Sequence, residues 1–169
     1  MRVTGLPGVK AETETWMRNL LLALQEAPID FEISRYRHWS ENHDPDARYE
    51  ASMVAERSVD LVIAKSLGTF IATLAFDSFR FKPRQAIFIG TPLGRHSEGN
   101  YELLLRFLDQ VPTLFIQQTS DFNGSYIELA NVVGNHQNAT LVEVSGDDHL
   151  YADIDELQKI ILPLLSNNT

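Results

Sequence analysis

The chain of 169 residues contains no cysteine. Disulfide bonds, thiolate metal sites and a catalytic thiol are therefore excluded, and the redox compartment is left unmarked. Basic residues are also scarce, because 14 Lys and Arg stand against 23 Asp and Glu for a net charge of −9. Nucleic acids and anionic membranes attract basic surfaces, so this balance argues against either of them as the main partner.

Long hydrophobic runs are missing as well. No apolar run approaches the length of a membrane span, and the N-terminus lacks the basic and then apolar segments of a secretion signal. We therefore expect a soluble cytoplasmic protein. The length and a hydrophobic content of 44% suit one globular domain, 1–169, that buries its own core.

Strand-like and helix-like segments alternate along the chain. Several strand-like segments are short, continuous apolar runs, which are typical of strands buried on both faces of a parallel sheet. The alternation predicts an α/β fold with helices on both faces of the sheet. The expected strands cover 1–5, 29–36, 60–65, 85–90, 113–119 and 140–146. The expected helices cover 11–26, 45–57, 68–79, 98–109, 125–135 and 153–166, the second with Asp44 as N-cap and Pro45 at its first position.

The stretch VIAKSLGTF, residues 62–70, combines a strand end and a helix start around Ser66. Its second neighbours, Ala64 and Gly68, are both small. A nucleophile that projects from a tight strand-to-helix turn needs small residues there, because large side chains would clash where the helix approaches the strand. A Ser at a helix start is also commonly an N-cap, so the motif by itself leaves both interpretations open.

Residues 64–68, A-K-S-L-G, resemble the nucleophile elbow of the α/β-hydrolase superfamily, with Ala64 where the usual G-x-S-x-G has Gly. In that family a Ser, an acidic residue and a His follow successive strands in this order. Asp121 and His149 follow the fifth and sixth expected strands, and the run GDDH that ends at His149 resembles the family's G-x-D-H loop. The resemblance therefore implies a triad of Ser66 as nucleophile, His149 as general base and Asp121 as the acid that orients the imidazole.

The resemblance also implies an oxyanion hole made by two backbone N–H groups. The first is that of Leu67, at the helix start. The stretch TGLPG, residues 4–8, resembles the family's H-G-x-P-G turn and makes Leu6 N–H the second donor, because Pro7 has none. Thr4 stands where that turn commonly has His, a departure that concerns the geometry of the oxyanion hole and not the triad.

The implied fold is a minimal α/β-hydrolase with a six-stranded parallel sheet in the order 2-1-3-4-5-6. The helices 11–26 and 153–166 are expected on one face and most of the others on the opposite face. Many members insert a helical cap before the fifth strand, but here the interval 91–112 holds little more than one helix, so we expect no cap and an open site. The first strand is short for mid-sheet, which indicates either a tight start or a missing upstream segment.

The chain resembles small bacterial serine hydrolases of the dienelactone-hydrolase-like kind, although their cysteine nucleophile is absent. This implies a carboxylesterase-like enzyme that acts on a small ester or thioester without cofactor or metal. Two alternatives stay open: a non-catalytic binding module, and an acyltransferase that uses the same residues.

Other residues invite functional interpretations that we rank lower. Asp147 and Asp148 adjoin His149, but neighbours on a turn rarely face each other's ring nitrogens, and a turn-forming role is expected for them. Asp121 could likewise serve only an Asx-turn. The loop 5–10 lacks the glycine spacing of a phosphate cradle. The remaining histidines have no metal-ligand spacing and are expected on the solvated surface; they are His38, His43, His96 and His136. An exposed basic strand end is expected at the close of the second strand, at Arg35, Arg37, His38 and Trp39.

Overall fold

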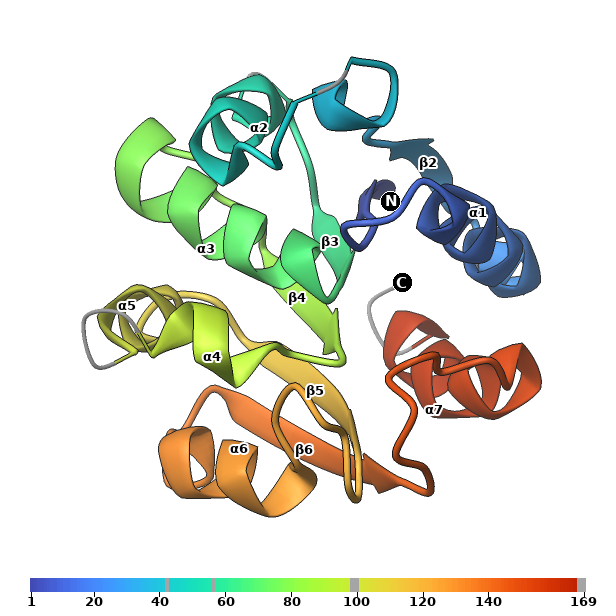
Figure 1. Ribbon diagram of the computed structural model, residues 1–169. Coiled ribbons are helices and arrows are strands. Elements are labelled where there is room, and N and C mark those ends of the chain that lie inside the picture. The colour runs from blue at the N-terminus through green and yellow to red at the C-terminus, as the bar shows by residue number, and fades with distance from the viewer. Residues whose placement is uncertain (42, 56, 98–100, 167–169) are drawn as a thin grey trace.

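The computed structural model describes residues 1–41, 43–55, 57–97 and 101–166. A parallel sheet of six strands runs through the molecule in the order β2-β1-β3-β4-β5-β6 (Figure 1). The strands are β1 (Arg2–Leu6), β2 (Asp30–Ile33), β3 (Leu61–Lys65), β4 (Gln85–Ile89), β5 (Thr113–Gln118) and β6 (Ala139–Val144). The fold class and strand order predicted from the sequence are confirmed.

The central strands are more deeply buried than the edge strands. Every residue of β3 and β5 is buried, whereas the edge strands β2 and β6 hold exposed or half-buried positions along most of their length. Strands covered by helices on both faces have no solvated side, which is why their sequences are continuous apolar runs. The short β1 pairs with β2 on one side and with β3 on the other.

Two groups of helices cover the two faces of the sheet (Figure 1). The first group packs α1 against α7 over one apolar cluster, as expected for 11–26 and 153–166. The second group packs over the opposite cluster. The first group consists of α1 (Glu12–Ala23), the 3-10 turn η1 (Leu24–Glu26) and α7 (Ile154–Ser166), and the second of η2 (Arg37–Trp39, also 3-10), α2 (Ala47–Val54), α3 (Leu67–Phe79), α4 (Leu93–His96), α5 (Glu102–Leu108) and α6 (Tyr126–Val133).

Three local expectations need correction. The N-cap of α2 is Asp46 and not Asp44, because the Asp46 carboxylate accepts the N–H of Tyr49 at 3.0 Å. The described residues between β4 and β5 form two short helices, α4 and α5, where little more than one helix was expected. The helix expected at 98–109 begins at Glu102, and residues 98–100 lie outside the described part of the chain.

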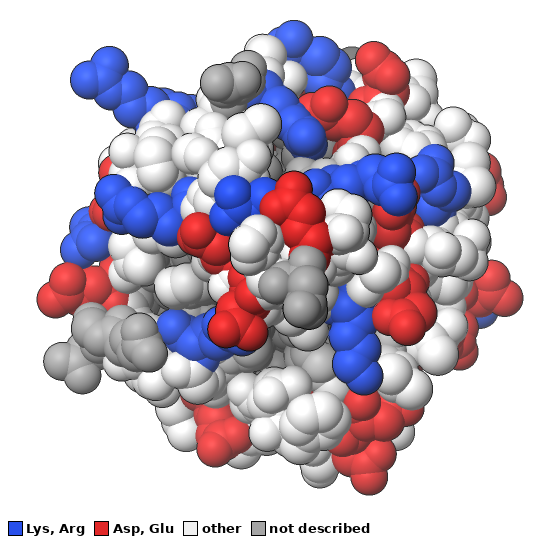
Figure 2. Space-filling model, turned by 45° about the horizontal axis from the view of Figure 1, so that its top comes forward, with Lys and Arg blue, Asp and Glu red and all other residues white. Residues whose placement is uncertain are grey.

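The surface in Figure 2 mixes charges of both signs, with Lys and Arg side chains lying between Asp and Glu. None of the helices in the described ranges is both long enough and apolar enough to cross a membrane.

The parallel arrangement of the strands determines where the polar loops lie. The carboxyl ends of all six strands meet at one edge, and the loops after β1, β3, β5 and β6 therefore gather there.

Candidate active site

Ser66 lies in a strained turn between β3 and α3. Its backbone angles are φ 51° and ψ −119°, in a region that residues other than glycine rarely adopt. The turn brings the start of α3 against β1 so closely that a Cβ at Gly68 would clash with the carbonyl of Leu6. The predicted reason for a small residue at position 68 is thus confirmed.

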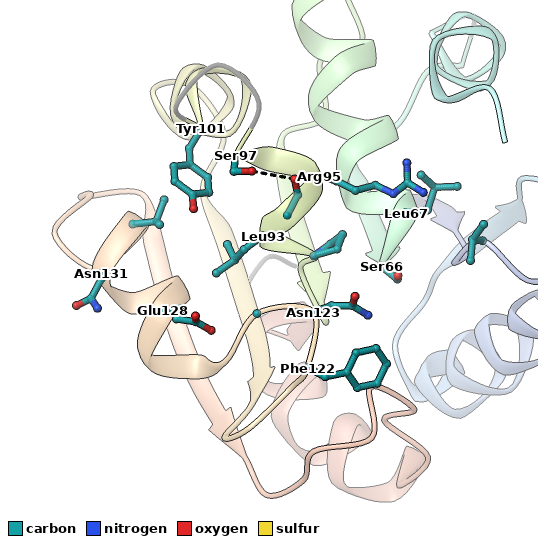
Figure 3. A pocket seen from close by; sticks show the side chains of 15 residues that line it. Ser66, Leu67, Leu93, Arg95, Ser97, Tyr101, Phe122, Asn123, Glu128 and Asn131 are labelled. Carbon is teal, nitrogen blue, oxygen red and sulfur yellow. Dashed lines mark hydrogen bonds between the residues drawn. The ribbon is translucent and has the colours of Figure 1, made fainter.

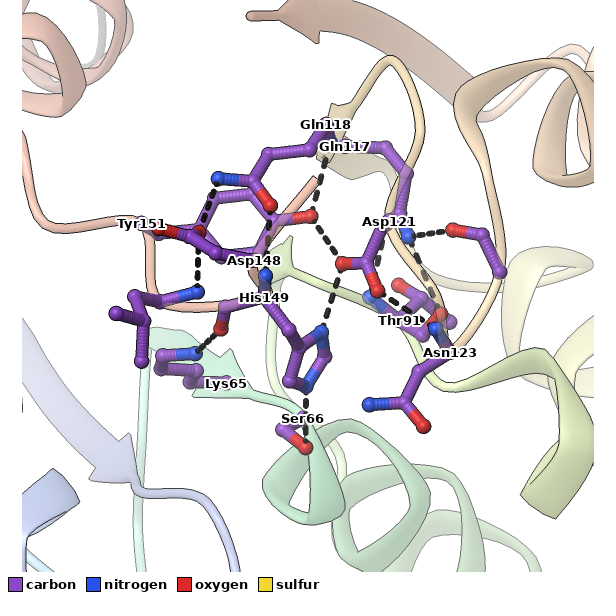
Figure 4. A network of polar contacts seen from close by, with 12 residues as sticks. Lys65, Ser66, Thr91, Gln117, Gln118, Asp121, Asn123, Asp148, His149 and Tyr151 are labelled. Carbon is purple, nitrogen blue, oxygen red and sulfur yellow. Dashed lines mark hydrogen bonds and ion pairs between the residues drawn. The ribbon is translucent and has the colours of Figure 1, made fainter. Parts of the chain in front are cut away.

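The structure brings together the three side chains that the sequence nominated (Figure 4). His149 Nε2 lies 2.9 Å from Ser66 Oγ, and His149 Nδ1 lies 2.7 Å from Asp121 Oδ2. Each residue comes from a different loop at the carboxyl edge of the sheet, after β3, β5 and β6. In this arrangement a base is in contact with an alcohol, and a carboxylate is in contact with the base.

Asp121 is 3% exposed and has three hydrogen-bond donors. His149 and the hydroxyl of Tyr151 both bind Oδ2, the latter at 2.7 Å, while the N–H of Asn123 binds Oδ1 at 2.8 Å. Burial alone would raise the pKa of Asp121, but these hydrogen bonds outweigh it and leave the pKa lowered. Asp121 therefore stays ionised beside the imidazole and also makes the Asx-turn considered for it.

The neighbouring carboxylates do not reach the imidazole nitrogens. Asp148 accepts hydrogen bonds from the side chain of Gln118 at 3.0 Å and from the N–H of Leu150 at 2.8 Å. It therefore stabilises the turn, as expected from the sequence. Asp147 is exposed.

The sequence did not predict the residues that lie behind the imidazole and hold His149 and Asp121 by hydrogen bonds. Tyr151 donates to Asp121 and accepts the N–H of Gln118 at 2.9 Å, while Gln118 Oε1 accepts the N–H of His149 at 2.9 Å. Lys65 Nζ donates to the carbonyl of His149 at 2.8 Å. One signal for these residues was present, because a buried apolar strand that ends in two glutamines places amides where hydrogen-bond partners must exist.

The rings of Tyr151 and His149 pack closely against the backbone of Gly90, which follows β4 and has a φ of 62°. A Cβ at this position would lie 2.6 Å from the ring of Tyr151 and 3.1 Å from Cε1 of His149. Only glycine meets both demands, the left-handed backbone and the absence of a side chain.

The two predicted oxyanion donors lie in different surroundings. Leu67 follows Ser66 at the start of α3 and lines the same cavity. Leu6 ends β1 in register with Ala64 and is fully buried. The loop after β1 then passes Ser66, since a Cβ at Gly8 would lie 3.5 Å from the Ser66 Cβ, and Val9 joins the wall of the cavity.

The segment around η2 holds this loop in place. The hydroxyl of Tyr36 donates to the carbonyl of Pro7 at 2.8 Å, and the ring nitrogens of His38 Nε2 and Trp39 Nε1 contact the carbonyl of Val9 at 2.7 and 2.9 Å. The expected exposed basic strand end is therefore correct only in part, because His38 and Trp39 turn inward toward the loop. The two arginines do follow the expectation more closely: Arg35 is exposed and pairs with Glu14, and Arg37 lies over the ring of Tyr49.

Ser66 opens onto a cavity of about 890 Å³ (Figure 3). The cavity runs from Ser66 and Phe122 toward Tyr101 and Asn131, between α4 and α6. Leu67 and other apolar side chains line it together with amides and charged groups. Phe122 is 72% exposed and lies against the ring of His149, with 5.6 Å between ring centres.

After His38, a second histidine contradicts its predicted surface position. His96 in α4 is 2% exposed, and its Nε2 lies 3.2 Å from the hydroxyl of Thr69, which donates to the Ser66 carbonyl at 2.8 Å. Burial lowers the pKa of His96 to about 3. His43 and His136 follow the prediction better, the first exposed and the second half-buried beside Asp109. Across the described ranges, no three His, Asp or Glu side chains gather closely enough to hold a metal ion.

Comparisons with known proteins identify the fold. No protein-family model and no curated protein matches the sequence. Among solved structures, the chain is similar to XC6422 from Xanthomonas campestris, an α/β serine hydrolase without a lid, with 17% identity, a TM-score of 0.72 and coverage of 99% of this chain and 81% of that one. It is also similar to the ydeN gene product of B. subtilis, with 16% identity, a TM-score of 0.70 and coverage of 98% and 97%.

A third similar structure is Est816, an enzyme that degrades N-acyl homoserine lactones, with 8% identity, a TM-score of 0.67 and coverage of 100% of this chain and 93% of that one. At these identities the likeness shows the fold alone. The chain therefore has the α/β-hydrolase fold, in the lidless form that XC6422 also has.

Proposed function

We propose that the protein is a serine hydrolase that acts on a small ester or thioester through an acyl-enzyme on Ser66. The observation that carries this proposal is the continuous hydrogen-bonded chain from Ser66 through His149 to Asp121, at 2.9 and 2.7 Å. A neutral hydroxyl is a poor nucleophile, and an adjacent base oriented by a carboxylate is the common way to activate it.

The reaction proceeds in two halves. Ser66 Oγ attacks the substrate carbonyl carbon while His149 Nε2 takes the hydroxyl proton, and the imidazolium then gives that proton to the leaving alcohol or thiol. In the second half His149 takes a proton from water, the resulting hydroxide attacks the acyl carbon, and the proton returns to Ser66 as the acid leaves. Asp121 holds Nδ1–H throughout and stabilises the imidazolium.

The oxyanion of each tetrahedral intermediate needs preorganised donors, and each such donor contributes roughly 10²–10³ in rate. We assign the first to the N–H of Leu67, which lies next to Ser66 at the cavity wall. We assign the second to the N–H of Leu6, the last residue of β1. The hydrogen bonds from Tyr36, His38 and Trp39 support this assignment, because they fix the loop that directly follows Leu6.

The cavity supports a small substrate. A volume of about 890 Å³ falls within the range of roughly 300–1,000 Å³ that small-molecule sites have. The lactone substrates of the similar Est816 are cyclic esters, which agrees with an ester as the bond that is cleaved. A short acyl chain fits a lidless site better than a long lipid, because little of the substrate is enclosed.

The binding-module alternative would be favoured if His149 lay out of hydrogen-bond reach of Ser66 and Asp121, and both distances argue against that. Acyl transfer uses the same residues and differs only in the acceptor. Product analysis with added alcohols or amines separates it from hydrolysis.

The test is covalent labelling. A fluorophosphonate probe should add its mass to the tryptic peptide that contains Ser66, and Ser66→Ala should abolish both labelling and the hydrolysis of p-nitrophenyl acetate. Ser78→Ala is a matched control, because Ser78 is exposed on α3 and lies outside the triad. A folded protein that resists the probe and leaves simple esters intact contradicts the proposal.

A further inference from the structure

Lys65 is a buried cation that the proposed chemistry leaves without a role. It is the last residue of β3, directly before Ser66, and is 4% exposed. A buried ammonium costs free energy unless specific contacts compensate for the water it has lost. The contacts of this amine therefore indicate what it does.

The ammonium group lies between a carbonyl and two aromatic rings. Lys65 Nζ donates to the carbonyl oxygen of His149 at 2.8 Å, as Figure 4 shows. It also lies 5.2 Å from the ring centre of Trp16 in α1 and 5.0 Å from that of Tyr151. These distances are within the range of cation–π attraction. Trp16 Nε1 in turn donates to the backbone carbonyl of Tyr151 at 2.9 Å, which links the Trp16 ring to the residue that carries the second ring.

The backbone of His149 needs such support. Its φ is 60°, in the left-handed region, which a residue other than glycine keeps only when its surroundings hold it there. Side chains hold both of its backbone polar groups: Gln118 accepts the N–H at 2.9 Å, and Lys65 binds the carbonyl. This backbone conformation determines the direction in which the imidazole leaves the loop.

We propose that Lys65 is a positioning residue for His149, whose carbonyl it holds so that the imidazole lies between Ser66 and Asp121. This inference rests on the proposed function, because the orientation of His149 affects turnover only if the imidazole moves protons. Misplacement of a reacting group by about 1 Å can cost on the order of 10²-fold in rate.

The charge of Lys65 adds a pH dependence. Burial lowers the pKa of Lys65 to about 8, against the opposing pull of Asp121 from the β5–α6 loop and of Asp148 from the β6–α7 loop. The Trp16 ring of α1 also faces the amine. Above about pH 8 the neutral amine still donates one hydrogen bond, but it loses the charge-assisted and cation–π parts of the interaction. Turnover should therefore fall as the pH rises through about 8.

The experiment compares Lys65→Met and Lys65→Arg with the wild type. The measurements are kcat and KM for p-nitrophenyl acetate and the rate at which the fluorophosphonate probe modifies Ser66. For Lys65→Met we expect kcat and the modification rate to fall by about 10–100-fold and KM to stay within about twofold. The thermal midpoint should decrease, because the substitution leaves the His149 carbonyl without its donor, so the rates are compared at a temperature at which both proteins are folded. Lys65→Arg stays charged, so it should recover part of the rate and lack the fall near pH 8.

Lys82→Met is the matched control, since Lys82 is exposed and the chemical change is the same. The inference is overturned if Lys65→Met modifies Ser66 at the wild-type rate. If Lys65→Met does not fold, the pH profiles decide: a wild type without a fall near pH 8, or the same fall in Lys65→Arg, overturns the inference. A wild type that never reacts with the probe is a different result, because it contradicts the proposed function itself.

Discussion

Two imidazoles contact the turn at Ser66, and their surroundings differ in one decisive respect. His149 touches the Ser66 hydroxyl with Nε2 and has the carboxylate of Asp121 on Nδ1. His96 touches Thr69 with Nε2, while its buried Nδ1 has no hydrogen-bond partner among the described residues. Since the Thr69 hydroxyl already donates to the Ser66 carbonyl, Nε2 of His96 must carry the proton of the neutral ring.

The second nitrogen therefore separates the two roles. A carboxylate on Nδ1 keeps the proton there and leaves Nε2 free to accept another from Ser66. A buried imidazole without such a partner stays neutral, with no proton on Nδ1. His96 is therefore suited to support the turn at Ser66 but not to take the proton of the Ser66 hydroxyl. The following substitutions test this comparison in order of expected effect.

The largest effect is expected from Asp121→Asn. The N–H of Asn123 donates to Oδ1, so the amide oxygen should stay at that position and direct the NH₂ group toward His149. Nδ1 must then be an acceptor, which gives His149 the tautomer of His96 with Nε2–H facing Ser66. We expect kcat to fall by about 10³–10⁴-fold, as measured with p-nitrophenyl acetate.

Asp148→Asn provides the matched control, because it removes a carboxylate next to His149 in the sequence that contacts Gln118 instead. A loss below about fivefold is expected for it. Equal losses for the two variants contradict the assignment of Asp121 as the orienting acid.

Much of the fold and of the site follows from the sequence for a physical reason. The buried strands β3 and β5 carry their burial in continuous apolar runs, and the carboxyl ends of parallel strands meet at one edge. Residues that follow β3, β5 and β6 therefore lie at one edge of the sheet, and the resemblance to the α/β-hydrolase superfamily nominated Ser66, Asp121 and His149 among them.

The surroundings of these residues could not be predicted in the same way. The contact of Lys65 with His149 depends on a left-handed backbone at position 149 that no local pattern encodes. His96 lies in a helix of 4 residues, which is too short to show an apolar period, so its burial left no trace in the sequence. The N-cap of α2 was likewise predicted two residues too early, at Asp44 instead of Asp46.

A moderate effect on stability is expected from His96→Gln, and it appears as a pH dependence. The pKa of His96 is about 3 in the folded protein and about 6.5 in the unfolded chain, so the unfolded state takes up the proton first on acidification. The free energy of unfolding should therefore decrease as the pH is lowered from about 6.5 to about 3, and this group contributes up to about 1.4 kcal/mol per pH unit. Urea titrations at several pH values should give a flatter profile for His96→Gln.

The exposed His43 supplies the control for that series, and His43→Gln should keep the wild-type slope. The slope is the informative quantity, because the substitution can also change stability at every pH through packing. If His96→Gln loses stability on acidification as steeply as the wild type, the buried imidazole is not what separates the two histidines.

The smallest effect is expected from Tyr151→Phe, which probes how much the carboxylate depends on a second donor. Asp121 Oδ2 accepts both His149 Nδ1–H and the Tyr151 hydroxyl, and loss of one hydrogen bond to a charged group is worth about 1.5–3 kcal/mol. The N–H of Gln118 also loses its acceptor. Because the imidazole keeps its carboxylate, we expect kcat to fall by only about 10-fold, while the thermal midpoint decreases. A loss as large as that of Asp121→Asn would show that the hydroxyl, and not the charge on Asp121, makes His149 different from His96.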